Sequence, residues 1–566
     1  MSNNHNWAVH NAMSLFGAYN KRRYIRKSKH LDRCTEKMLM GILRRNQNTE
    51  LGKKWGFASI HSIQDYQDRI PFTSYDDYVE YVDRIAKTGE QNLVTADKVT
   101  FLATTSGTTG VMKRIPVNRR SFMPVLRSTS CIYNIILDEM KKRGVTRGRG
   151  LITLESGCTF TESGIRQGFI SSFVMSSGDL VVTRLSVIPP ELSGYGEEVD
   201  MKYVKARYAL ADRDMAFIIS AFMSSLVDLT RYIADSKDLL IRDIEQGVID
   251  PSVKMPPELR AELEAKLSPD PKRAAELREA LDFSQPKGVL RRAWPRLCVL
   301  VAIGSGELEP FTRKMRSFCG EEVAVCHKLY ASSEATFGTV IRAEDDQYLL
   351  LPDSGFFEFI PMGEPFDEKK DRPLLPYELE VGKHYEVVVT NLAGLYRYRI
   401  KDVVLVSGFL NQSPLLRFAY RHSQVINITG LKLTSEHLVS TMRALSERLG
   451  VNIIDYSIYA DTEQVPWRLV LFVEFDGDAP QGVDLSLLFD EELAKVNQEH
   501  GHMLDIGETS PSTVCVMKRN TYSELREENA SHKTSSNQVK TVRYIGTREL
   551  YNQFMERVAK VYERGI

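Results

Sequence analysis

The stretch TTSGTTG at residues 104–110, with Lys113 just beyond it, is the part of this sequence that most constrains the fold. It stands between two runs rich in β-branched and aromatic residues, 99–105 and 114–117, so the local order is strand, glycine turn, strand. The glycines allow a tight turn that presents successive backbone N–H groups, the hydroxyls add donors, and Lys113 adds positive charge. The stretch predicts a loop that wraps a polyphosphate. A threonine-rich hairpin turn is the plainer interpretation.

This loop differs from the GxxxxGK[ST] loop of P-loop NTPases. The lysine has the wrong spacing, and no helix evidently follows the loop. The sequence also contains no GxSxG elbow, and its eleven histidines form no HExxH motif, so hydrolase and metalloprotease functions have little support.

A second candidate motif is YASSE at residues 330–334. It lies downstream of LCVLVAI, residues 297–303, a continuous apolar run that indicates a buried strand and leads into the glycine turn GSGE. A single glutamate at the end of a strand can hold Mg²⁺, which in turn holds phosphate oxygens. The alternative is an ordinary surface glutamate after a turn.

A third candidate motif is YRYRIKD at residues 396–402. Its aspartate can accept hydrogen bonds from both hydroxyls of a ribose, and its arginines can meet a phosphate with a fork of donors. A cross-strand ladder of ion pairs would look much the same in sequence, so both interpretations stay open.

Composition restricts the class of protein. Lysine plus arginine equals aspartate plus glutamate at 74 each over 566 residues, so no global field favours nucleic acid or anionic lipid. Hydrophobic residues at 43% and charged residues at 26% are typical of a soluble globular protein. Seven scattered cysteines without a CxxC motif, and no signal peptide, favour a reducing cytoplasmic location.

Two segments raise the question of a membrane. Residues 215–234 form the most apolar region, but serines and an aspartate interrupt it, so we expect a buried core helix rather than a membrane span. Six basic residues fall between Lys21 and Lys29. They indicate either a solvated helix face or a patch for a membrane surface or a partner.

The order of elements predicts a mixed α/β fold. Residues 7–95 and 256–282 have helical patterns, and strand patterns recur at 151–154, 180–183, 386–390, 468–475 and 513–517. A polar stretch at 411–414 is the best boundary. We expect a large N-terminal domain (1–412), a hinge (413–430) and a smaller C-terminal α/β domain (431–566).

Together the three motifs form, in this order, the signature of adenylate-forming enzymes such as acyl-CoA synthetases, peptide-synthetase adenylation domains and luciferase. The blocks TTSGTTG, YASSEATFG and GLYRYRIKDVVLVSGFLNQSPLLRF, with NQVKTVRYIG near the end, resemble more closely the auxin-responsive Gretchen Hagen family of acyl acid amido synthetases. The likeness covers most of the chain. The block ITGLKLTSE departs from the plant wording and points to a non-plant-type member.

The resemblance implies a role for each matching residue. Glu334 would coordinate Mg²⁺, Asp402 would bind the ribose, and the C-terminal domain would swing about a segment near Arg417. The residues implied to bind ATP are Ser106, Gly107, Thr108, Thr109, Lys113, Tyr330, Ala331, Ser332, Ser333, Asp402 and Arg417. The residues implied to act in catalysis are Lys432, Lys540 and Arg399.

The sequence departs from the family pattern at three places. Lys401 stands where the family usually has glycine in YRxGD, Val542 replaces a common proline, and Leu431 changes the hinge wording. A bulky cation beside the ribose-binding aspartate would tune the site or block it.

The implied function is an ATP- and Mg²⁺-dependent ligase that activates a small carboxylic acid as acyl-AMP and conjugates it to an amino acid or another amine. A thioester-forming acyl-CoA ligase shares the first half-reaction and is the alternative enzyme. A family member that binds nucleotide without catalysis is the third possibility, because of Lys401. We expect no nucleic-acid partner and no transmembrane segment, and take a monomer as the working hypothesis.

Overall fold

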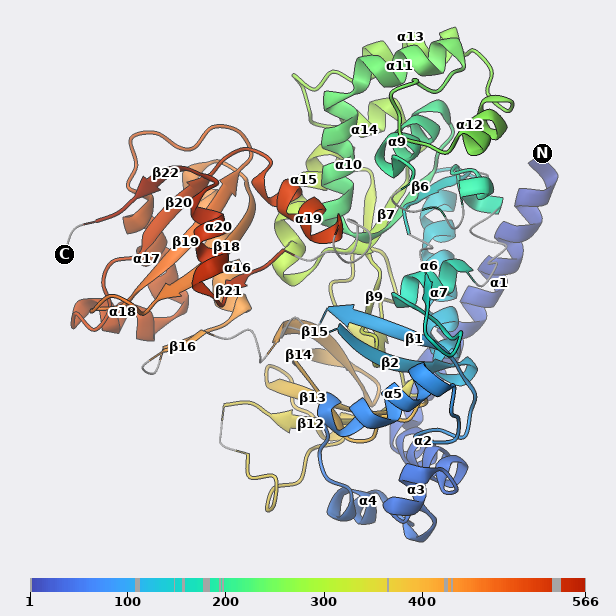
Figure 1. The fold of residues 1–566 in the computed structure, drawn as a ribbon, viewed down its shortest axis with the longest axis vertical. Helices are drawn as coiled ribbons and strands as arrows, with labels where there is room; N and C mark the ends of the chain where they lie inside the picture. Colours follow the sequence, from blue (N-terminus) through green and yellow to red (C-terminus); the bar gives the residue numbers. More distant parts are fainter. Residues whose placement is uncertain are drawn as a thin grey trace. The chain divides into compact units, whose positions relative to one another are not determined.

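The chain divides into two compact units (Figure 1), each of which is assembled from several segments. The first comprises Met1–Ala221, Leu229–Ile303 and Arg316–Ala419, and the second comprises Phe222–Asp228, Gly304–Met315 and Tyr420–Ile566. The computed structural model describes residues 3–106, 112–146, 148–154, 158–176, 184–192, 195, 198–363, 366–421, 426–428, 431–531 and 541–564.

The first unit begins with helices, as the sequence predicts. Thr49 and Ser62 cap two of them by accepting hydrogen bonds from the backbone N–H groups of Gly52 and Asp65. The helices are α1 (Asn3–Lys27), α2 (Leu31–Asn46), α3 (Glu50–Lys54), α4 (Ile63–Arg69) and α5 (Val79–Thr88).

The glycine-rich stretch lies between two antiparallel strands, which confirms the predicted strand–turn–strand order. The strands are β1 (Val99–Ser106) and β2 (Met112–Asn118), and β4 (Thr159–Phe160) and β5 (Arg166–Gly168) complete a sheet of order β2-β1-β5-β4. As expected, a strand and not a helix is the next element after the glycine-rich loop. The long helix α6 (Arg119–Lys142) begins directly after β2, where Asn118 caps it by accepting from the Ser121 N–H at 2.9 Å.

A second sheet of the first unit has the order β3-β6-β7-β8. Its strands are β3 (Gly150–Ile152), β6 (Phe217–Phe222), β7 (Val299–Ile303) and β8 (Ala324–His327), and the pairs β3–β6 and β7–β8 are parallel. The strands predicted at 151–154 and 297–303 are confirmed, while 180–183 lies outside the described residues. The other helices of this part of the first unit, of which α9 contacts β3 and α7 contacts β1 of the first sheet, are α7 (Ile170–Ser176), α9 (Met201–Ala211), α11 (Lys237–Gln246), α12 (Pro257–Glu264), α13 (Pro271–Ala280) and α14 (Val289–Ala293).

The helix predicted over 215–234 is wrong in its first part. Residues Phe217–Phe222 form the strand β6, and only Met223–Asp235 form a helix, α10. The side chains from Met215 to Ile219 are all buried. The sequence there therefore lacks the periodic pattern of apolar and polar residues that would distinguish a strand from a helix. α15 (Glu309–Cys319) likewise follows β7, and both α10 and α15 have their first residues in the second unit.

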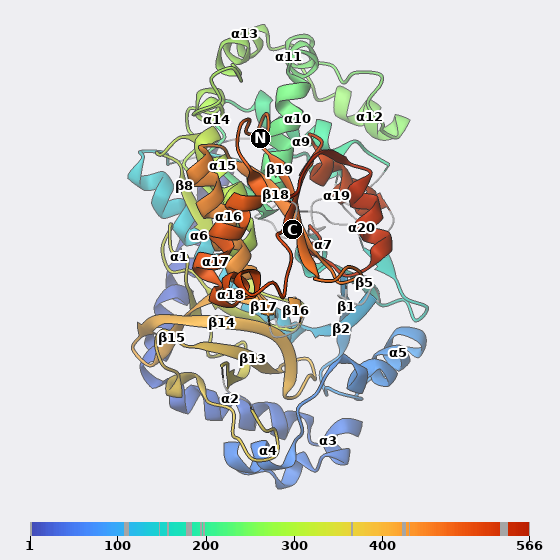
Figure 2. The same ribbon diagram turned by 90° about the vertical axis from the view of Figure 1, so that its left-hand side faces the viewer.

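The largest sheet of the first unit has the order β12-β13-β14-β15-β11-β10-β9. Helix α2 packs against it at β12, and Figure 2 shows α2 below β13 and β14. The strands are β9 (Leu329–Ala331), β10 (Thr336–Thr339), β11 (Tyr348–Leu350), β12 (Gly355–Pro361), β13 (His384–Asn391), β14 (Tyr398–Leu410) and β15 (Ser413–Arg421).

The border between the units falls at Ala419 and Tyr420, inside β15. The polar stretch taken as the boundary is instead the turn between β14 and β15, where Gln412 accepts from the Leu31 N–H. The observed border lies within the predicted hinge, 413–430. Whether that segment acts as a hinge stays a prediction.

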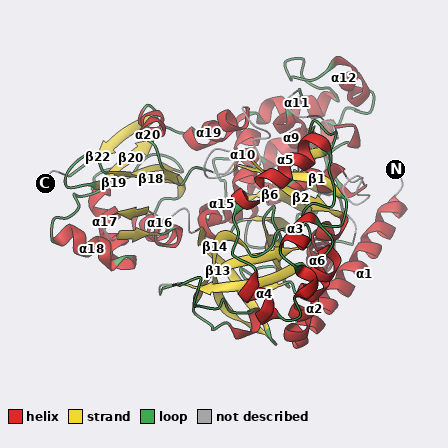
Figure 3. Ribbon diagram, turned by 60° about the horizontal axis from the view of Figure 1, so that its bottom comes forward, coloured by secondary structure: helices red, strands yellow, loops and turns green. Residues whose placement is uncertain are grey.

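The second unit contains a five-stranded sheet whose two faces are covered by different helices (Figure 3). Alternate residues of β19 point to opposite cores: Leu471 packs with α16 and α17, whereas Phe472 packs with α19 and α20. The sheet order is β21-β18-β19-β20-β22. The strands are β18 (Ile453–Asp461), β19 (Arg468–Phe475), β20 (Thr513–Met517), β21 (Tyr544–Ile545) and β22 (Val558–Tyr562), with a separate hairpin of β16 (Ile426–Ile428) and β17 (Leu431–Leu433). The helices are α16 (Ser435–Leu449), α17 (Leu485–Val496), α18 (Gln498–Asp505), α19 (Thr521–Ser531) and α20 (Arg548–Met555).

This arrangement confirms the mixed α/β fold class, and β19 and β20 coincide with the strands predicted at 468–475 and 513–517. Within the described ranges, no helix has the length and apolar character needed to cross a membrane.

Candidate functional site

The structure brings the second and third motifs together at one buried contact. The Tyr330 hydroxyl on β9 donates a hydrogen bond to Asp402 Oδ2 on β14 at 3.1 Å, and the two residues are 8% and 3% exposed. Because β15, β11 and β10 lie between these strands, a flat sheet would separate them by about 19 Å at about 4.8 Å per step. The sheet must therefore curl. Phe337, Tyr348 and Phe418, one from each intervening strand, surround the Tyr330 ring at centroid distances of 4.7, 6.0 and 6.1 Å.

The turn that carries Glu334 is fixed through its backbone. The Ser332 N–H donates to the Ala335 carbonyl at 2.9 Å, and the Glu334 N–H donates to Ser332 Oγ at 3.2 Å. At the end of β13, Asn391 Nδ2 donates to the Glu334 carbonyl at 2.7 Å. Asn391 Oδ1 accepts from the backbone N–H of Leu395, 2.9 Å away.

Asn391 thus ties the YASSE turn to the start of the YRYRIKD block, and sequence reasoning missed it. The available signal was an asparagine directly after a predicted strand, three residues before a glycine. Gly394 has a φ of 107°, and an added Cβ would lie 2.7 Å from the Val94 carbonyl oxygen, so only glycine fits there.

Asp402 is presented by an irregularity in the sheet. The pairing of β13 with β14 shifts between Glu386 and Val388, so residues 400–402 stand opposite a single residue. Lys401, in the middle of this bulge, has a φ of 66°, in the left-handed region that favours glycine. The left-handed backbone conformation at position 401 therefore explains why the YRxGD motif usually has glycine there. The Lys401 ammonium lies 3.8 Å from Glu386 Oε1, and its side chain is 44% exposed.

Replacing Lys401 by glycine is expected to relieve this backbone strain. We expect Lys401→Gly to be about 1 kcal/mol more stable than Lys401→Ala, since both remove the ammonium but only glycine takes positive φ freely. Urea unfolding of the two variants measures the difference. Equal stabilities would contradict the strain argument.

The two arginines of the third motif form the ion-pair ladder that the sequence left open. Arg399 donates to both oxygens of the buried Glu386 at 2.8 and 2.7 Å and to Glu368 at 2.6 Å. These hydrogen bonds, first that to Glu386, raise the pKa of Arg399. Arg397 is buried, with its guanidinium carbon 4.1 Å from the Phe72 ring centroid. The side chain of Arg399 is thus already bound to two carboxylates. Its catalytic role stays a prediction.

Other candidate residues are placed only in part. Lys113 on β2 pairs with Thr105 in the strand register, and its ammonium lies 5.5 Å from the Tyr75 ring centroid. Arg417 on β15 forms an exposed ion pair with Asp346 at 2.8 Å. Gly107, Thr108, Thr109 and Lys540, and the side chains of Ser106 and Lys432, lie outside the described residues.

Lys328 is a further residue that sequence reasoning did not single out. It joins β8 to β9, two residues before Tyr330, and among the described residues no carboxylate pairs with it. Desolvation in the protein interior lowers the pKa of Lys328 to about 8, although the side chain keeps some contact with water.

This lysine is expected to make stability depend on pH. The unfolded chain holds the proton up to a pKa near 10.5, whereas the folded chain releases it near 8, so stability should rise as pH increases between these values. We expect Lys328→Met to be about 1–3 kcal/mol more stable than the unaltered protein at pH 7. Its stability should no longer rise with pH in the range where Lys328 titrates. Thermal unfolding across the pH range, with the exposed Lys98→Met as control, measures both effects. An unchanged pH profile would contradict the prediction.

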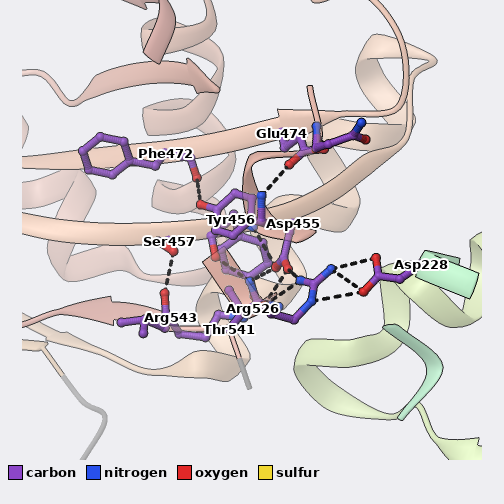
Figure 4. A network of polar contacts seen from close by, with 12 residues as sticks. Asp228, Asp455, Tyr456, Ser457, Phe472, Glu474, Arg526, Thr541 and Arg543 are labelled. Carbon is purple, nitrogen blue, oxygen red and sulfur yellow. Dashed lines mark hydrogen bonds and ion pairs between the residues drawn. The ribbon is translucent and has the colours of Figure 1, made fainter. Parts of the chain in front are cut away.

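In the second unit, one buried carboxylate holds both flanks of the segment that contains Lys540 (Figure 4). Before that segment, Arg526 on α19 donates to Asp455 Oδ2 at 2.9 Å. After it, Thr541 donates to the same oxygen at 2.7 Å, and Arg543 donates to Asp455 Oδ1. Arg526 also donates to Asp228 Oδ1 at 2.9 Å. Residues 526 and 541–543 are thus anchored to β18.

The described donor set suits a magnesium nucleotide. Among the described residues no cluster of three metal-ligating side chains exists, and Glu334 is a single carboxylate beside two serines. Mg²⁺ bound to a nucleotide commonly uses one or two protein carboxylates, with phosphates and water as the other ligands. Glu334 therefore fits such an ion.

Three family models together match nearly the whole chain. The GH3 family N-terminal domain matches residues 21–324, the central domain matches 348–421 and the C-terminal domain matches 436–549. The chain belongs to the GH3 family. This confirms the resemblance drawn from the motifs.

Relatives of this GH3 chain are known by sequence and by structure. It is 28% identical over 567 residues to a putative indole-3-acetic acid-amido synthetase of Arabidopsis thaliana, with 91% of this chain and 93% of the relative covered. It is 26% identical to jasmonoyl–L-amino acid synthetase JAR4 of Nicotiana attenuata, with 92% of each covered. The solved GH3.15 acyl acid amido synthetase superimposes with a TM-score of 0.83 at 22% identity, over 94% of this chain and 95% of that one.

Proposed function

We propose that this GH3 protein is an acyl acid amido synthetase, which activates a small carboxylic acid with ATP as acyl-AMP and transfers the acyl group to an amino acid or another amine. Family membership and the activities for which the relatives are named support this proposal. The single structural observation behind it is the Tyr330–Asp402 contact, because it joins two of the three motifs at one buried place.

Different residues of the first unit bind different parts of ATP during adenylation. Asp402 accepts hydrogen bonds from the ribose hydroxyls, and Tyr330 orients its carboxylate. The loop from Ser106 to Thr109, with Lys113, holds the phosphates of ATP. Glu334 would hold Mg²⁺, which would supply positive charge to the phosphates. Catalysis then consists mainly of positioning and charge stabilisation, with no covalent enzyme intermediate.

The second half-reaction requires the amine to reach the mixed anhydride. We propose that the unit containing Lys432 and Lys540 changes position between the two half-reactions, so that one site serves both. The anchoring of residues 526 and 541–543 on Asp455 supports this proposal, because it gives the Lys540 segment fixed flanks. We also propose a cytoplasmic, monomeric enzyme that uses Mg²⁺.

ATP–pyrophosphate exchange tests the first half-reaction. Purified protein with Mg²⁺ is assayed against a panel of small aromatic, indolic and fatty acids, and exchange with at least one acid is expected. No exchange with any acid, while ATP still binds, would favour a nucleotide-binding member without catalysis.

Amide formation tests the second half-reaction. With an acid that supports exchange, each amino acid and coenzyme A are supplied separately and the products identified by mass spectrometry. An acyl–amino acid product is expected. Turnover only with coenzyme A would replace the proposal by the thioester-forming alternative.

A further inference from the structure

The outer face of α1 is apolar where a helix on a protein surface is normally polar. Leu15, Tyr19 and Phe16 are 74%, 60% and 44% exposed, and they lie within five residues of one another. Spacings of three and four place Leu15 and Tyr19 in one row with Arg22 and Arg26. The row therefore begins with apolar side chains and continues with basic ones.

The opposite face of α1 is buried, yet it carries small and polar residues. Gly17 allows close packing on α6, since an added Cβ would lie 2.1 Å from the Ser130 carbonyl oxygen. Asn20 donates to Ser130 Oγ at 3.0 Å, and His10 Nε2 lies 3.0 Å from the Gly148 carbonyl oxygen. The helix is thus attached through these polar contacts and through Tyr24, which is 1% exposed, whereas Leu15, Phe16 and Tyr19 stay largely exposed to solvent.

The charge of this region has one sign. Residues 1–31 contain six lysines and arginines and no aspartate or glutamate, in a chain whose formal net charge is zero. Arg23 and Lys27 pair with the buried Asp353, whereas Arg22, Arg26 and Lys29 are exposed. The exposed basic groups continue the outer face beyond its apolar part.

We propose that the outer face of α1 (Leu15, Phe16, Tyr19, Arg22 and Arg26), together with Lys29 in the turn that follows, binds the surface of a membrane that contains anionic phospholipids. Helices with aromatic and aliphatic residues beside lysines and arginines lie in the bilayer interface, where the apolar side chains enter the headgroup region and the cations contact lipid phosphates.

A membrane with anionic phospholipids fits the positive charge of this face better than a second copy of the chain does. A symmetric contact through this face would bury the exposed cations of both copies, and residues 1–31 supply no carboxylate to neutralise them. The inference is independent of the proposed activity, since it rests on α1 alone.

Vesicle co-sedimentation of the full-length protein tests the proposal. Binding to phosphatidylcholine vesicles that contain phosphatidylglycerol is expected, with weak binding to phosphatidylcholine alone and release by salt. Charge reversal in Arg22→Glu, Arg26→Glu and Lys29→Glu combined should reduce partitioning about 100-fold or more. Serine at positions 15, 16 and 19 should also abolish binding.

A matched control reverses three exposed lysines elsewhere, in Lys53→Glu, Lys54→Glu and Lys98→Glu combined, and should leave vesicle binding unchanged. Circular dichroism checks that every variant is folded, whatever its activity. Equal binding by the two triple variants, or no binding of the unaltered protein to anionic vesicles, would overturn the proposal. A dimer that light scattering detects, and that the serine variant loses, would assign the face to a second copy instead.

Discussion

Removal of the Asp402 carboxylate in Asp402→Ala is expected to weaken ATP binding by roughly tenfold to a hundredfold. Charged hydrogen bonds contribute about 1.5–3 kcal/mol each, and Asp402 is a buried carboxylate at the point where two motifs meet. Isothermal titration with ATP and Mg²⁺ measures the loss.

Two controls make this experiment specific. Asp478→Ala removes an exposed carboxylate in the loop after β19 and should leave ATP affinity unchanged. Tyr330→Phe removes only the hydroxyl that donates to Asp402 and should have a smaller effect than Asp402→Ala. If Asp402→Ala binds ATP as the unaltered protein does, the assignment of the ribose site is wrong.

Removal of the buried carboxylate of Asp455 is expected to destabilise the second unit by about 3–5 kcal/mol. The variant Asp455→Ala would leave Arg526 and Arg543, both nearly inaccessible to water, without the acceptor they share. Breaking a buried ion pair by removing one partner has this magnitude because an uncompensated charge remains.

Because the chain has two units, a global unfolding midpoint does not isolate this effect. Amide hydrogen exchange of β18 and α19 reports the second unit directly and should accelerate strongly in Asp455→Ala. Asp228→Ala is the graded control, because it removes only one of the two carboxylates that pair with Arg526 and leaves Arg543 paired. A loss below about 1 kcal/mol in Asp455→Ala would contradict the prediction.

Short runs of apolar and β-branched residues, and the glycine turn, made part of the fold predictable. The strands at 468–475 and 513–517 coincide with β19 and β20, and the glycine-rich stretch lies between two antiparallel strands as expected. The helix expected at 215–234 was wrong because uniformly buried residues carry no period, so the sequence could not distinguish β6 from the start of α10.

The candidate site was predictable as a set of residues but not as an arrangement. Nothing in the local pattern shows that the sheet curls until Tyr330 meets Asp402, since that contact depends on the strand order. The chemistry of arginine suits phosphate and carboxylate equally, so only the structure could show Arg399 bound to Glu386. The side-chain amide of Asn391 donates a hydrogen bond to a backbone carbonyl that is distant in the sequence, and no sequence motif identifies such a contact.

The discontinuous second unit limits where this chain can be recombined with its relatives. Within that unit, residues after 420 depend on partners from two short upstream segments. Arg526 pairs with Asp228, Arg443 lies 3.4 Å from Glu309, and Asp476 pairs with Lys314. A chimaera joined at residue 420 would transplant one half of each pair. Exchange of C-terminal portions between GH3 proteins should therefore require residues 222–228 and 304–315 to move with them.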